Sequence, residues 1–358
     1  MDKWKRRIVL FVLAVAGCAN AVLAAPFAYI TNANGGNVSV IDIPTNTVVA
    51  TVPTGGGPFG IGAIFGGTRA YVADIGADNV TVIDTATNTV VATVPVGVIP
   101  EGVAVSPSGG SVYVTNWGSN TVSLIDAATN TVLATIPVGT QPQGVAFNPS
   151  GTRAYIANRA SNDVSVIDTA TKAVIATIPM GVDGFGVIAS STRVYVTNIA
   201  SHSVSVIDTP ANVVETTIPV GGAPEGIALD PTGTRLYVTN TGSNNVSVID
   251  TASNMVIATI AVGSSPVGVS FTPDGARAYV ANFNSNNVSV IDTATNTVVA
   301  TIPAGASPAS FGLFITGPGS LPPGMIPTLS PFGSAVLGLL LAIAAFWLLK
   351  RRGRLTPG

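Results

Sequence analysis

A repeat centred on a tyrosine runs through most of this chain. One clear copy, residues 235–276, reads RLYVTNTGSNNVSVIDTASNMVIATIAVGSSPVGVSFTPDGA. The tyrosines recur every 42 residues, with one interval of 40, at Tyr29, Tyr71, Tyr113, Tyr155, Tyr195, Tyr237 and Tyr279. A fixed period of about 40 to 50 residues is typical of a β-propeller or a solenoid. Because the repeat uses all seven tyrosines of the chain, we do not expect any of them to be catalytic.

Each copy contains four short segments with the composition of β-strands. A small apolar segment follows a Pro-x-Gly turn, the tyrosine segment comes second, and a segment of the type NVSVID comes third. A segment of the type TVVATIP comes last, where a proline near its end is tolerated at a sheet edge. Val, Ile, Thr, Ala and Gly dominate the copies, which favours strands and tight turns. Seven copies of four antiparallel strands predict an all-β, seven-bladed propeller over residues 26–316.

The ends of the repeat region predict how the ring of blades closes. The region begins on a second strand at 27–32 and ends on an inner strand at 309–316. We therefore expect the last blade to combine this C-terminal inner strand with three N-terminal strands, which removes the open edges. Between Gly186 and Arg193 one copy is two residues short and lacks the Pro-x-Gly turn. We expect a tightened reversal there within an intact blade.

The tyrosine segments also carry a family resemblance. The runs Tyr-Val-Thr-Asn at Tyr113, Tyr195 and Tyr237, with variants in the other copies, resemble the YVTN family of propeller repeats. The similarity covers residues 27–316. It implies a propeller of the kind found in secreted bacterial and archaeal surface proteins, and it implies no particular activity, because propellers host many functions.

Charge separates the repeat region from the two ends of the chain. Only 9% of the residues are charged, and the repeats hold 16 acidic residues against 7 basic ones, a balance of −9. An acidic domain repels phosphate backbones, so we expect no nucleic-acid partner. The sole cysteine, Cys18, precedes the repeats, which therefore contain neither a disulfide nor a reactive thiol.

Residues 1–25 have the pattern of a secretory signal peptide. Four basic residues precede an apolar run that begins at Ile8, and small residues follow around Ala24. Cleavage near Ala24 by signal peptidase would export the propeller. The sequence Val-Ala-Gly before Cys18 also resembles a lipoprotein box, which would make Cys18 a lipidated first residue.

The C-terminal 42 residues predict a spacer and a membrane-sorting signal. Residues 317–325 are rich in Gly and Pro, and residues 332–349 are 18 uncharged, mostly apolar residues followed by a basic tail. That length is sufficient for one transmembrane helix, with the basic tail cytoplasmic and the propeller on the far side of the membrane.

A short motif in the segment 326–358 gives this signal a family resemblance. The run Ile326, Pro327, Thr328 and Leu329 lies ahead of the apolar stretch, and the segment resembles the IPTL class of C-terminal sorting domains. The resemblance implies a Gram-negative bacterium and an exosortase-type sorting enzyme as partner. The alternative is a plain single-span anchor. Either predicts a periplasmic or cell-surface propeller, held first in the inner membrane.

Repeated charged residues are expected to serve the architecture. An aspartate ends every third strand, where its carboxylate can cap the amides of the next turn: Asp42, Asp84, Asp126, Asp168, Asp208, Asp250 and Asp292. Five copies start the neighbouring second strand with Arg69, Arg153, Arg193, Arg235 or Arg277. Because adjacent strands are antiparallel, we expect each arginine to pair with the aspartate across from it.

Positions that differ between copies are the better candidates for a binding site. In a propeller the loops before the inner strands and those after the second strands open on one face. The first set provides Phe59, Glu101, Gln143, Phe185, Glu225, Val267 and Ala309. The second provides Ala33, Ile75, Trp117, Arg159, Ile199, Thr241 and Phe283. Together they predict a binding face around the channel mouth. The alternative is that exposed loop tips vary without constraint.

Known catalytic patterns are not found in the sequence. His202 is the only histidine and has no other metal-binding residue near it, so we interpret it as a solvated loop residue. Glu101 and Glu225 lie three copies apart and are expected to be too far apart to share a proton. We therefore expect no catalytic residues, no metal and no cofactor.

The sequence alone favours a non-enzymatic binding or structural protein of the cell envelope with an unidentified envelope or extracellular ligand. The main alternative is a periplasmic propeller enzyme of the lactonase or dehydrogenase type, with its site at the channel mouth. A self-associating surface-layer component is a further possibility.

Overall fold

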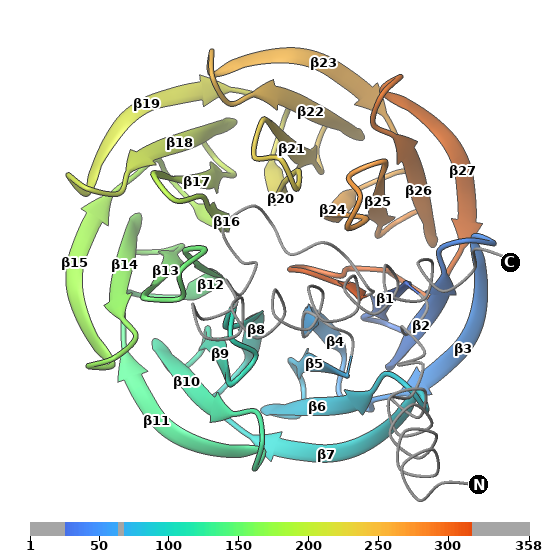
Figure 1. The fold of residues 1–358 in the computed structure, drawn as a ribbon, viewed down its shortest axis with the longest axis horizontal. Helices are drawn as coiled ribbons and strands as arrows, with labels where there is room; N and C mark the ends of the chain where they lie inside the picture. Colours follow the sequence, from blue (N-terminus) through green and yellow to red (C-terminus); the bar gives the residue numbers. More distant parts are fainter. Residues whose placement is uncertain (1–25, 64–67, 317–358) are drawn as a thin grey trace, which may run out of the picture. The chain divides into compact units, whose positions relative to one another are not determined.

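Seven four-stranded antiparallel sheets surround a central axis (Figure 1). The computed structural model describes residues 26–63 and 68–316. Blade 1 contains β28, β1, β2 and β3, and blades 2 to 7 contain β4–β7, β8–β11, β12–β15, β16–β19, β20–β23 and β24–β27. The predicted seven-bladed propeller is therefore confirmed, including the blade that joins the two ends of the repeat region.

The strands repeat with almost constant length. The inner strands are β4 (Pro58–Ala63), β8 (Pro100–Val105), β12 (Pro142–Phe147), β16 (Gly184–Ala189), β20 (Pro224–Leu229), β24 (Pro266–Phe271) and β28 (Ile315–Thr316). The second strands are β1 (Phe27–Asn32), β5 (Arg69–Asp74), β9 (Ser111–Asn116), β13 (Arg153–Asn158), β17 (Arg193–Asn198), β21 (Arg235–Asn240) and β25 (Arg277–Asn282).

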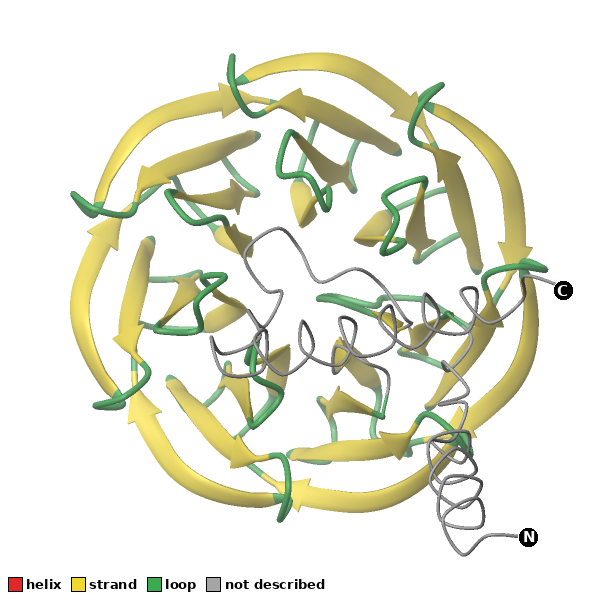
Figure 2. Ribbon diagram, viewed as in Figure 1, coloured by secondary structure: helices red, strands yellow, loops and turns green. Residues whose placement is uncertain are grey.

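The third and outer strands complete each blade. The third strands are β2 (Asn37–Asp42), β6 (Asn79–Asp84), β10 (Thr121–Asp126), β14 (Asp163–Asp168), β18 (Ser203–Asp208), β22 (Asn245–Asp250) and β26 (Asn287–Asp292). The outer strands are β3 (Thr47–Pro53), β7 (Thr89–Pro95), β11 (Thr131–Pro137), β15 (Ala173–Pro179), β19 (Val213–Pro219), β23 (Met255–Ala261) and β27 (Thr297–Pro303). Every regular element of the described residues is a strand (Figure 2).

The repeated tyrosines pack between neighbouring blades. Tyr29 is fully buried, and its hydroxyl donates to Asn88 Oδ1 of blade 2 at 2.8 Å. The Tyr279 hydroxyl of blade 7 donates to Asn46 Oδ1 of blade 1 at 2.7 Å, so the same contact spans the closure of the ring. Both faces of the second strand are buried, which explains why that strand is apolar almost throughout.

The predicted aspartate caps form in all seven blades. In blade 3 the Thr129 N–H donates to Asp126 Oδ1 at 2.8 Å, and in blade 6 the Ser253 N–H donates to Asp250 Oδ1 at 2.7 Å. The other five aspartates accept from the amide three residues later in the same way. The aspartates therefore stabilise the turns that lead into the outer strands.

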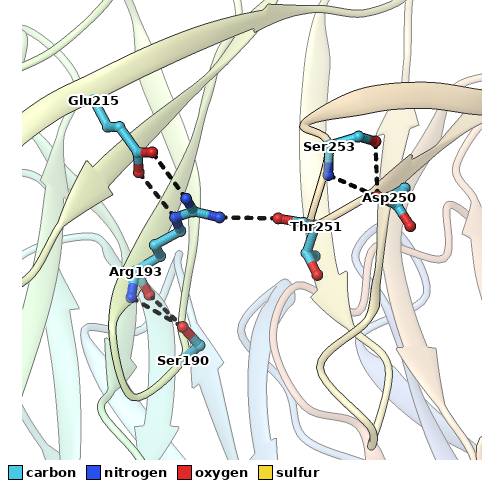
Figure 3. A network of polar contacts seen from close by, with 6 residues as sticks. All are labelled: Ser190, Arg193, Glu215, Asp250, Thr251 and Ser253. Carbon is cyan, nitrogen blue, oxygen red and sulfur yellow. Dashed lines mark hydrogen bonds and ion pairs between the residues drawn. The ribbon is translucent and has the colours of Figure 1, made fainter.

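The predicted cross-strand placement of arginine opposite aspartate is confirmed in all five blades, but these side chains form no direct ion pair among the described residues. The Arg193 guanidinium instead donates to Glu215 of its own blade through Nε and Nη2, both at 2.8 Å, and to the Thr251 carbonyl of blade 6 at 2.9 Å (Figure 3). Arg69, Arg153 and Arg235 likewise donate to a carbonyl of the next blade. The aspartates are already engaged by the turn amides, and the long arginine side chains cross-link adjacent blades.

The short copy forms a complete blade, as predicted. In blade 5 the strands β16 and β17 are joined by only three residues, 190–192. The Ser190 N–H donates to the Arg193 carbonyl at 2.8 Å, which closes the tightened reversal.

The closing inner strand differs from the prediction. Only Ile315–Thr316 forms a strand, whereas 309–316 was expected to do so. The Tyr29 N–H of β1 donates to the Phe314 carbonyl, but the Ile61 N–H of β4 donates to the Phe311 carbonyl, each at 2.8 Å. The segment thus leaves blade 1 and also bonds to the inner strand of blade 2. Gly312 permits this with φ of 114°, since an added Cβ would lie 2.4 Å from the Ile61 carbonyl oxygen.

Several predicted segments lie outside the described residues: the signal peptide at 1–25 with Cys18, the spacer at 317–325, and the sorting signal at 326–358 with its helix at 332–349. Within residues 26–63 and 68–316 no helix is both long and apolar enough to cross a membrane.

Blade 2 contains a buried acid where the other blades contain an amide. Six second strands end in asparagine, whose Nδ2 donates to a third-strand serine, as from Asn198 to Ser205 at 2.9 Å. Blade 2 has Asp74, which is fully buried and accepts from the Thr81 hydroxyl at 2.6 Å. Its other oxygen, Oδ1, has no partner. Burial raises the pKa of Asp74 to about 6.

We predict that Asp74→Asn stabilises the propeller at pH 8 by about 2 kcal/mol, because a carboxylate no longer has to be ionised in a buried site. The native Asp74 carboxyl binds its proton more tightly in the folded than in the unfolded chain. Its presence therefore costs stability as the pH rises from about 4 to about 6, and this cost is constant above pH 6. Urea unfolding at pH 4 and pH 8 measures the difference.

The matched control for this prediction is Asn198→Asp, which places the same acid in blade 5 and should destabilise the protein at pH 8. Equal effects of Asp74→Asn at both pH values would show that ionisation of Asp74 is not the cause.

Candidate functional site

Side chains of the inner strands converge on the propeller axis. Val103, Val145 and Val187 line a small cavity on this axis. The strand register shifts just before each of these valines, so simple alternation does not orient the residues two positions earlier. Their own contacts do, since the Phe185 ring packs against Phe311, which lines the same cavity. Those residues are Glu101, Gln143, Phe185 and Glu225 among others, and all belong to the first predicted set. The structure thus places this set at the start of the inner strands, around the channel mouth.

The second predicted set lies beside the loops that lead to the first set in all seven blades. In each blade the same backbone hydrogen bond holds the two loops together. In blade 3 the Trp117 N–H donates to the Ile99 carbonyl at 2.9 Å, and in blade 4 the Arg159 N–H donates to the Gln141 carbonyl at 3.0 Å. The corresponding donors elsewhere are Ala33, Ile75, Ile199, Thr241 and Phe283. Each contact joins the loop after a second strand to the loop before the inner strand of the same blade.

Three phenylalanine rings meet across the propeller axis at the level of the first predicted set. The Phe185 and Phe311 ring centroids are 4.8 Å apart, and Phe59 lies 6.4 Å from Phe185 and 6.2 Å from Phe311. These rings come from blades 5, 1 and 2, so together they cross the axis. The cavity that Phe311 also lines measures about 20 Å³, room for about one water molecule. The three rings therefore form an aromatic cluster that fills the axis at the mouth.

Phe311 was not among the predicted residues. The sequence pattern indicated Ala309, which is fully buried against β1 and donates its N–H to the Thr31 carbonyl at 2.8 Å. The closing segment departs from the repeat, and its reversal toward blade 2 directs Phe311 to the axis. The sequence signals this departure at residues 308–310, which read Pro-Ala-Ser. The other copies have glycine at the third of these positions.

Arg159 is fixed over blade 5 by an ion pair. Its Nε contacts Asp183 Oδ1, and its Nη2 lies 3.3 Å from Asp183 Oδ2. The Asp183 N–H in turn donates to Asn162 Oδ1 at 2.9 Å. Asp183 was missed in the sequence, where it looks like an ordinary loop residue. Comparison of the copies would have found it, because the matching positions of the other blades are Gly57, Ile99, Gln141, Ala223, Ser265 and Ser307.

The pKa values of the Glu101 and Glu225 carboxyls are raised well above the usual value for glutamate. Burial raises the pKa of Glu101 to about 7, the Arg159 charge and Gln143 oppose this rise, and the Glu225 charge adds to it. Burial likewise raises the pKa of Glu225 to about 7, against Thr241 and Arg159 and together with the Asp183 charge. The two carboxyls therefore interact electrostatically across the mouth, which their separation in the repeat did not predict. Both exchange protons near neutral pH.

Two polar atoms near these carboxyls are buried without a partner. Gln143 is only 1% exposed, and its Oε1 accepts no hydrogen bond. The Trp117 Nε1–H is likewise buried and unpaired. Such groups cost about 1–3 kcal/mol each unless a water or ligand engages them. Blade 3 and blade 4 thus offer one free donor and one free acceptor at the mouth.

Acidic, basic and amide side chains at the two predicted sets of positions, together with Asp183, fall in blades 3 to 6. Blades 3 to 6 contribute Glu101, Gln143, Arg159, Asp183 and Glu225. Blades 7, 1 and 2 contribute Val267, Phe311 and Phe59 at the corresponding places. The predicted residues Ile75, Ile199 and Phe283 are half-buried on the same loops and add no polar group. The mouth is therefore acidic on one side and apolar on the other.

The only histidine of the chain, a residue type that commonly binds metals, is engaged in a structural hydrogen bond. His202 Nδ1 accepts from the Ala223 N–H at 3.0 Å, the same contact that Asn244 Oδ1 makes with Ser265 in the next blade. Among residues 26–63 and 68–316, no group of three or more His, Cys, Asp or Glu side chains is arranged to hold a metal ion. The chemistry of the mouth therefore depends on carboxyl, guanidinium and amide groups.

Comparisons with known families match separate parts of the chain. The YNCE-like beta-propeller family matches residues 173–277, and the cytochrome D1 heme domain matches residues 25–149. A search of the curated proteins finds no match.

Solved structures resemble most of the propeller. Hydrazine synthase of Kuenenia stuttgartiensis is 23% identical, with a TM-score of 0.69 over 77% of this chain and 98% of that chain. A functionally unknown protein from Desulfotomaculum acetoxidans is 15% identical, with a TM-score of 0.70 over 82% of this chain and 99% of that chain. At these identities the likeness concerns the fold.

The comparisons correct one expectation and establish the fold class. The match of residues 25–149 to a heme domain contradicts the expectation of a non-enzymatic surface protein and agrees better with the alternative, a propeller enzyme. The chain is a β-propeller protein.

Proposed function

We propose that this protein is an exported propeller enzyme that performs acid–base chemistry on a small substrate at the channel mouth. The observation that carries the proposal is the pair of partly buried carboxyls, Glu101 and Glu225, beside the Arg159 guanidinium. Burial brings the pKa of each carboxyl to about 7. A group that titrates near the working pH is the most effective proton donor and acceptor.

Hydrolysis of a lactone or ester fits this set of groups best. One carboxylate takes a proton from an attacking water molecule and returns it to the oxygen that leaves the carbonyl carbon. Arg159 stabilises the negative charge that develops on the carbonyl oxygen, since a guanidinium has five donors and Asp183 takes two of them. The aromatic cluster on the axis excludes water from that side.

A heme does not fit the described residues of the mouth. Heme iron is held by His, Met, Cys or Tyr. His202 Nδ1 is engaged by the Ala223 amide, and the repeated tyrosines are buried between blades. Met180 packs against the hydrophobic cluster between blades 4 and 5, and Met255 lies on an outer strand. The likeness to the cytochrome D1 heme domain therefore supports an enzymatic role without supporting a heme at the mouth.

Export and sorting complete the proposal. We assign the repeats to the YVTN family and residues 326–358 to the IPTL class of sorting signals, on the Tyr-Val-Thr-Asn runs and on the order of motif, apolar stretch and basic tail. Signal peptidase removes residues 1–25, and an exosortase-type enzyme processes the C-terminal segment in the inner membrane. The propeller then works in the periplasm or at the cell surface.

Mass spectrometry of the protein isolated from its cell envelope tests this route. We expect an N-terminus near residue 25 and a C-terminus before the basic tail. An intact C-terminus would instead identify a plain membrane anchor, and a lipid-modified Cys18 would identify a lipoprotein.

The hydrolytic activity is tested with the full chain on γ-butyrolactone, δ-valerolactone and p-nitrophenyl acetate between pH 5 and pH 9. We expect turnover with a pH dependence centred near pH 7, and we expect Glu225→Gln to lower kcat/KM about 100-fold or more because the proton acceptor is lost. Glu215→Gln is the matched control, since Glu215 pairs with Arg193 on an outer strand. Equal activity of the two variants would refute the assignment.

Arg159→Gln tests the electrostatics of the mouth. Arg159 lowers the pKa of both Glu101 and Glu225, so its removal should raise both values by about half a pH unit or more, which corresponds to roughly 0.7 kcal/mol. The chain has only three glutamates, so carboxyl resonances of selectively ¹³C-labelled glutamate resolve them, with Glu215 as internal reference. Unchanged titration of Glu101 and Glu225 would show that Arg159 does not act on them.

A further inference from the structure

A hydrogen bond that joins the second and third strands of six blades lacks its donor in blade 2. In those six blades the asparagine at the end of the second strand donates its Nδ2 to the first residue of the third strand, at 2.6 Å to 3.2 Å. Blade 2 has Asp74 and Asn79 at these two positions, and they are direct partners in the strand register. A carboxylate accepts hydrogen bonds but donates none.

The Asn79 amide presents its acceptor to this acid. Its Nδ2 donates to the Ala77 carbonyl at 3.2 Å, as the matching Asn37 Nδ2 donates to the Gly35 carbonyl at 2.8 Å. The Asn37 Oδ1 accepts from the second strand of its own blade, whereas the Asn79 Oδ1 is buried without a partner. Asp74 is fully buried, and its Oδ1 also has no partner. A protonated Asp74 supplies the missing donor, because a carboxylic acid has one O–H.

Ionisation of Asp74 reverses the preferred orientation of the Asn79 amide. Two acceptors would then face each other in a buried site, which is unfavourable. A half-turn of the amide brings its Nδ2 to the carboxylate, but the same turn places its Oδ1 against the Ala77 carbonyl. The bond from Asn79 to Ala77 is therefore lost when Asp74 is ionised.

The loop that contains Ala77 supports a glycine-rich loop, residues 54–57, which leads into the inner strand of blade 2. The Gly76 N–H donates to the Gly56 carbonyl at 2.7 Å. Gly56 also lies directly against the switch residues, since an added Cβ would lie 2.5 Å from the Ala77 Cβ and 3.1 Å from the Asp74 Cβ. A change at Asp74 or Ala77 thus reaches the loop 54–57.

Two side-chain contacts that hold the matching loops of other blades are replaced in blade 2. In five blades a serine hydroxyl accepts from the loop amide, as Ser119 accepts from the Val98 N–H at 2.7 Å, and Ala77 stands at this position in blade 2. Six loops also donate an amide to a side chain of the preceding blade, and Gly36 replaces that side chain for the loop 54–57. The loop 54–57 therefore depends on its backbone contacts more than the other loops do.

We propose that Asp74 and Asn79 form a proton-operated switch for the loop 54–57. Protonated Asp74 holds the loop through Asn79 and Ala77, and ionised Asp74 releases it. Pro58 pairs with Asp74, and the next residue, Phe59, belongs to the aromatic cluster on the propeller axis, so the released loop is the one that leads to this cluster. The switch does not depend on the hydrolytic function proposed above.

The switch operates near pH 6, because burial raises the pKa of Asp74 to about 6. The elements around the carboxyl place uncharged residues against it: Pro58 on β4, Asn79 and Thr81 on β6, and Thr54 with Gly56 on the loop. The charged residues on these and adjoining elements are Arg69 and Asp84 at the far ends of β5 and β6, Asp78 on the loop after β5, and Glu101 on β8 of blade 3. The loop 54–57 is thus held below pH 6 and released above it.

Amide resonances of the ¹⁵N-labelled full chain test the switch between pH 4.5 and pH 8. We expect the Asn79 side-chain amide, assigned by its loss in Asn79→Ser, and the Gly56 and Gly76 backbone amides to titrate with one midpoint near pH 6. The order parameter of the Gly56 amide should fall from about 0.85 at pH 4.5 to below about 0.6 at pH 8. Val98, at the matching position of blade 3, should stay ordered at both pH values.

Two variants separate the proton from the loop. Asp74→Asn restores the donor of the other six blades and should keep Gly56 ordered at both pH values. Ala77→Ser restores the serine contact, so the Asn79 amide should still titrate while Gly56 stays ordered at pH 8.

Three results would overturn the inference. The first is a Gly56 amide that titrates equally in the native chain and in Asp74→Asn, which would assign the effect to another group such as Glu101. The second is an Asn79 side-chain amide that does not respond to pH in the native chain. The third is a Gly56 amide with the same order parameter at pH 4.5 and pH 8.

Discussion

Closure of the ring by one chain segment is the constraint on which the rest of the propeller depends. Each blade gains its stability from tyrosine, valine and isoleucine side chains buried against the next blade, so an open ring would expose two such faces. Residues 305–316 prevent this by bonding to β1 of blade 1 and to β4 of blade 2. The segment has no second copy in the chain, and it is where the repeat ends.

The same segment determines the character of the mouth. Because it crosses from blade 1 to blade 2, it places Phe311 against Phe59 and Phe185 on the propeller axis. Glu101 and Glu225 belong to the inner strands around this aromatic cluster, and burial is the main cause of their raised pKa. The segment that closes the ring thus also supplies one of the side chains on the propeller axis.

Local and periodic features of the sequence were sufficient to predict the fold. The tyrosine period gave seven blades, and the aspartate caps followed because each acts on an amide three residues away. The arginine ion pairs failed because strand register does not decide which carbonyl or carboxylate a long side chain reaches. Phe311 and Asp183 were missed because a unique segment has no copy to compare with and a loop residue has no periodic pattern.

Residues that recur in every blade serve the architecture of the propeller, and residues that differ between blades are the candidates for a functional site. Tyrosine between blades and aspartate at the turns recur in every blade, and each has a structural partner. A sevenfold ring of identical mouth residues would present seven equal charges that repel one another. The inner-strand position instead reads Phe, Glu, Gln, Phe, Glu, Val and Ala, and this broken symmetry gathers the polar groups on one side. An asymmetric ligand can be oriented only by such a difference between the blades, so function must reside where the copies disagree.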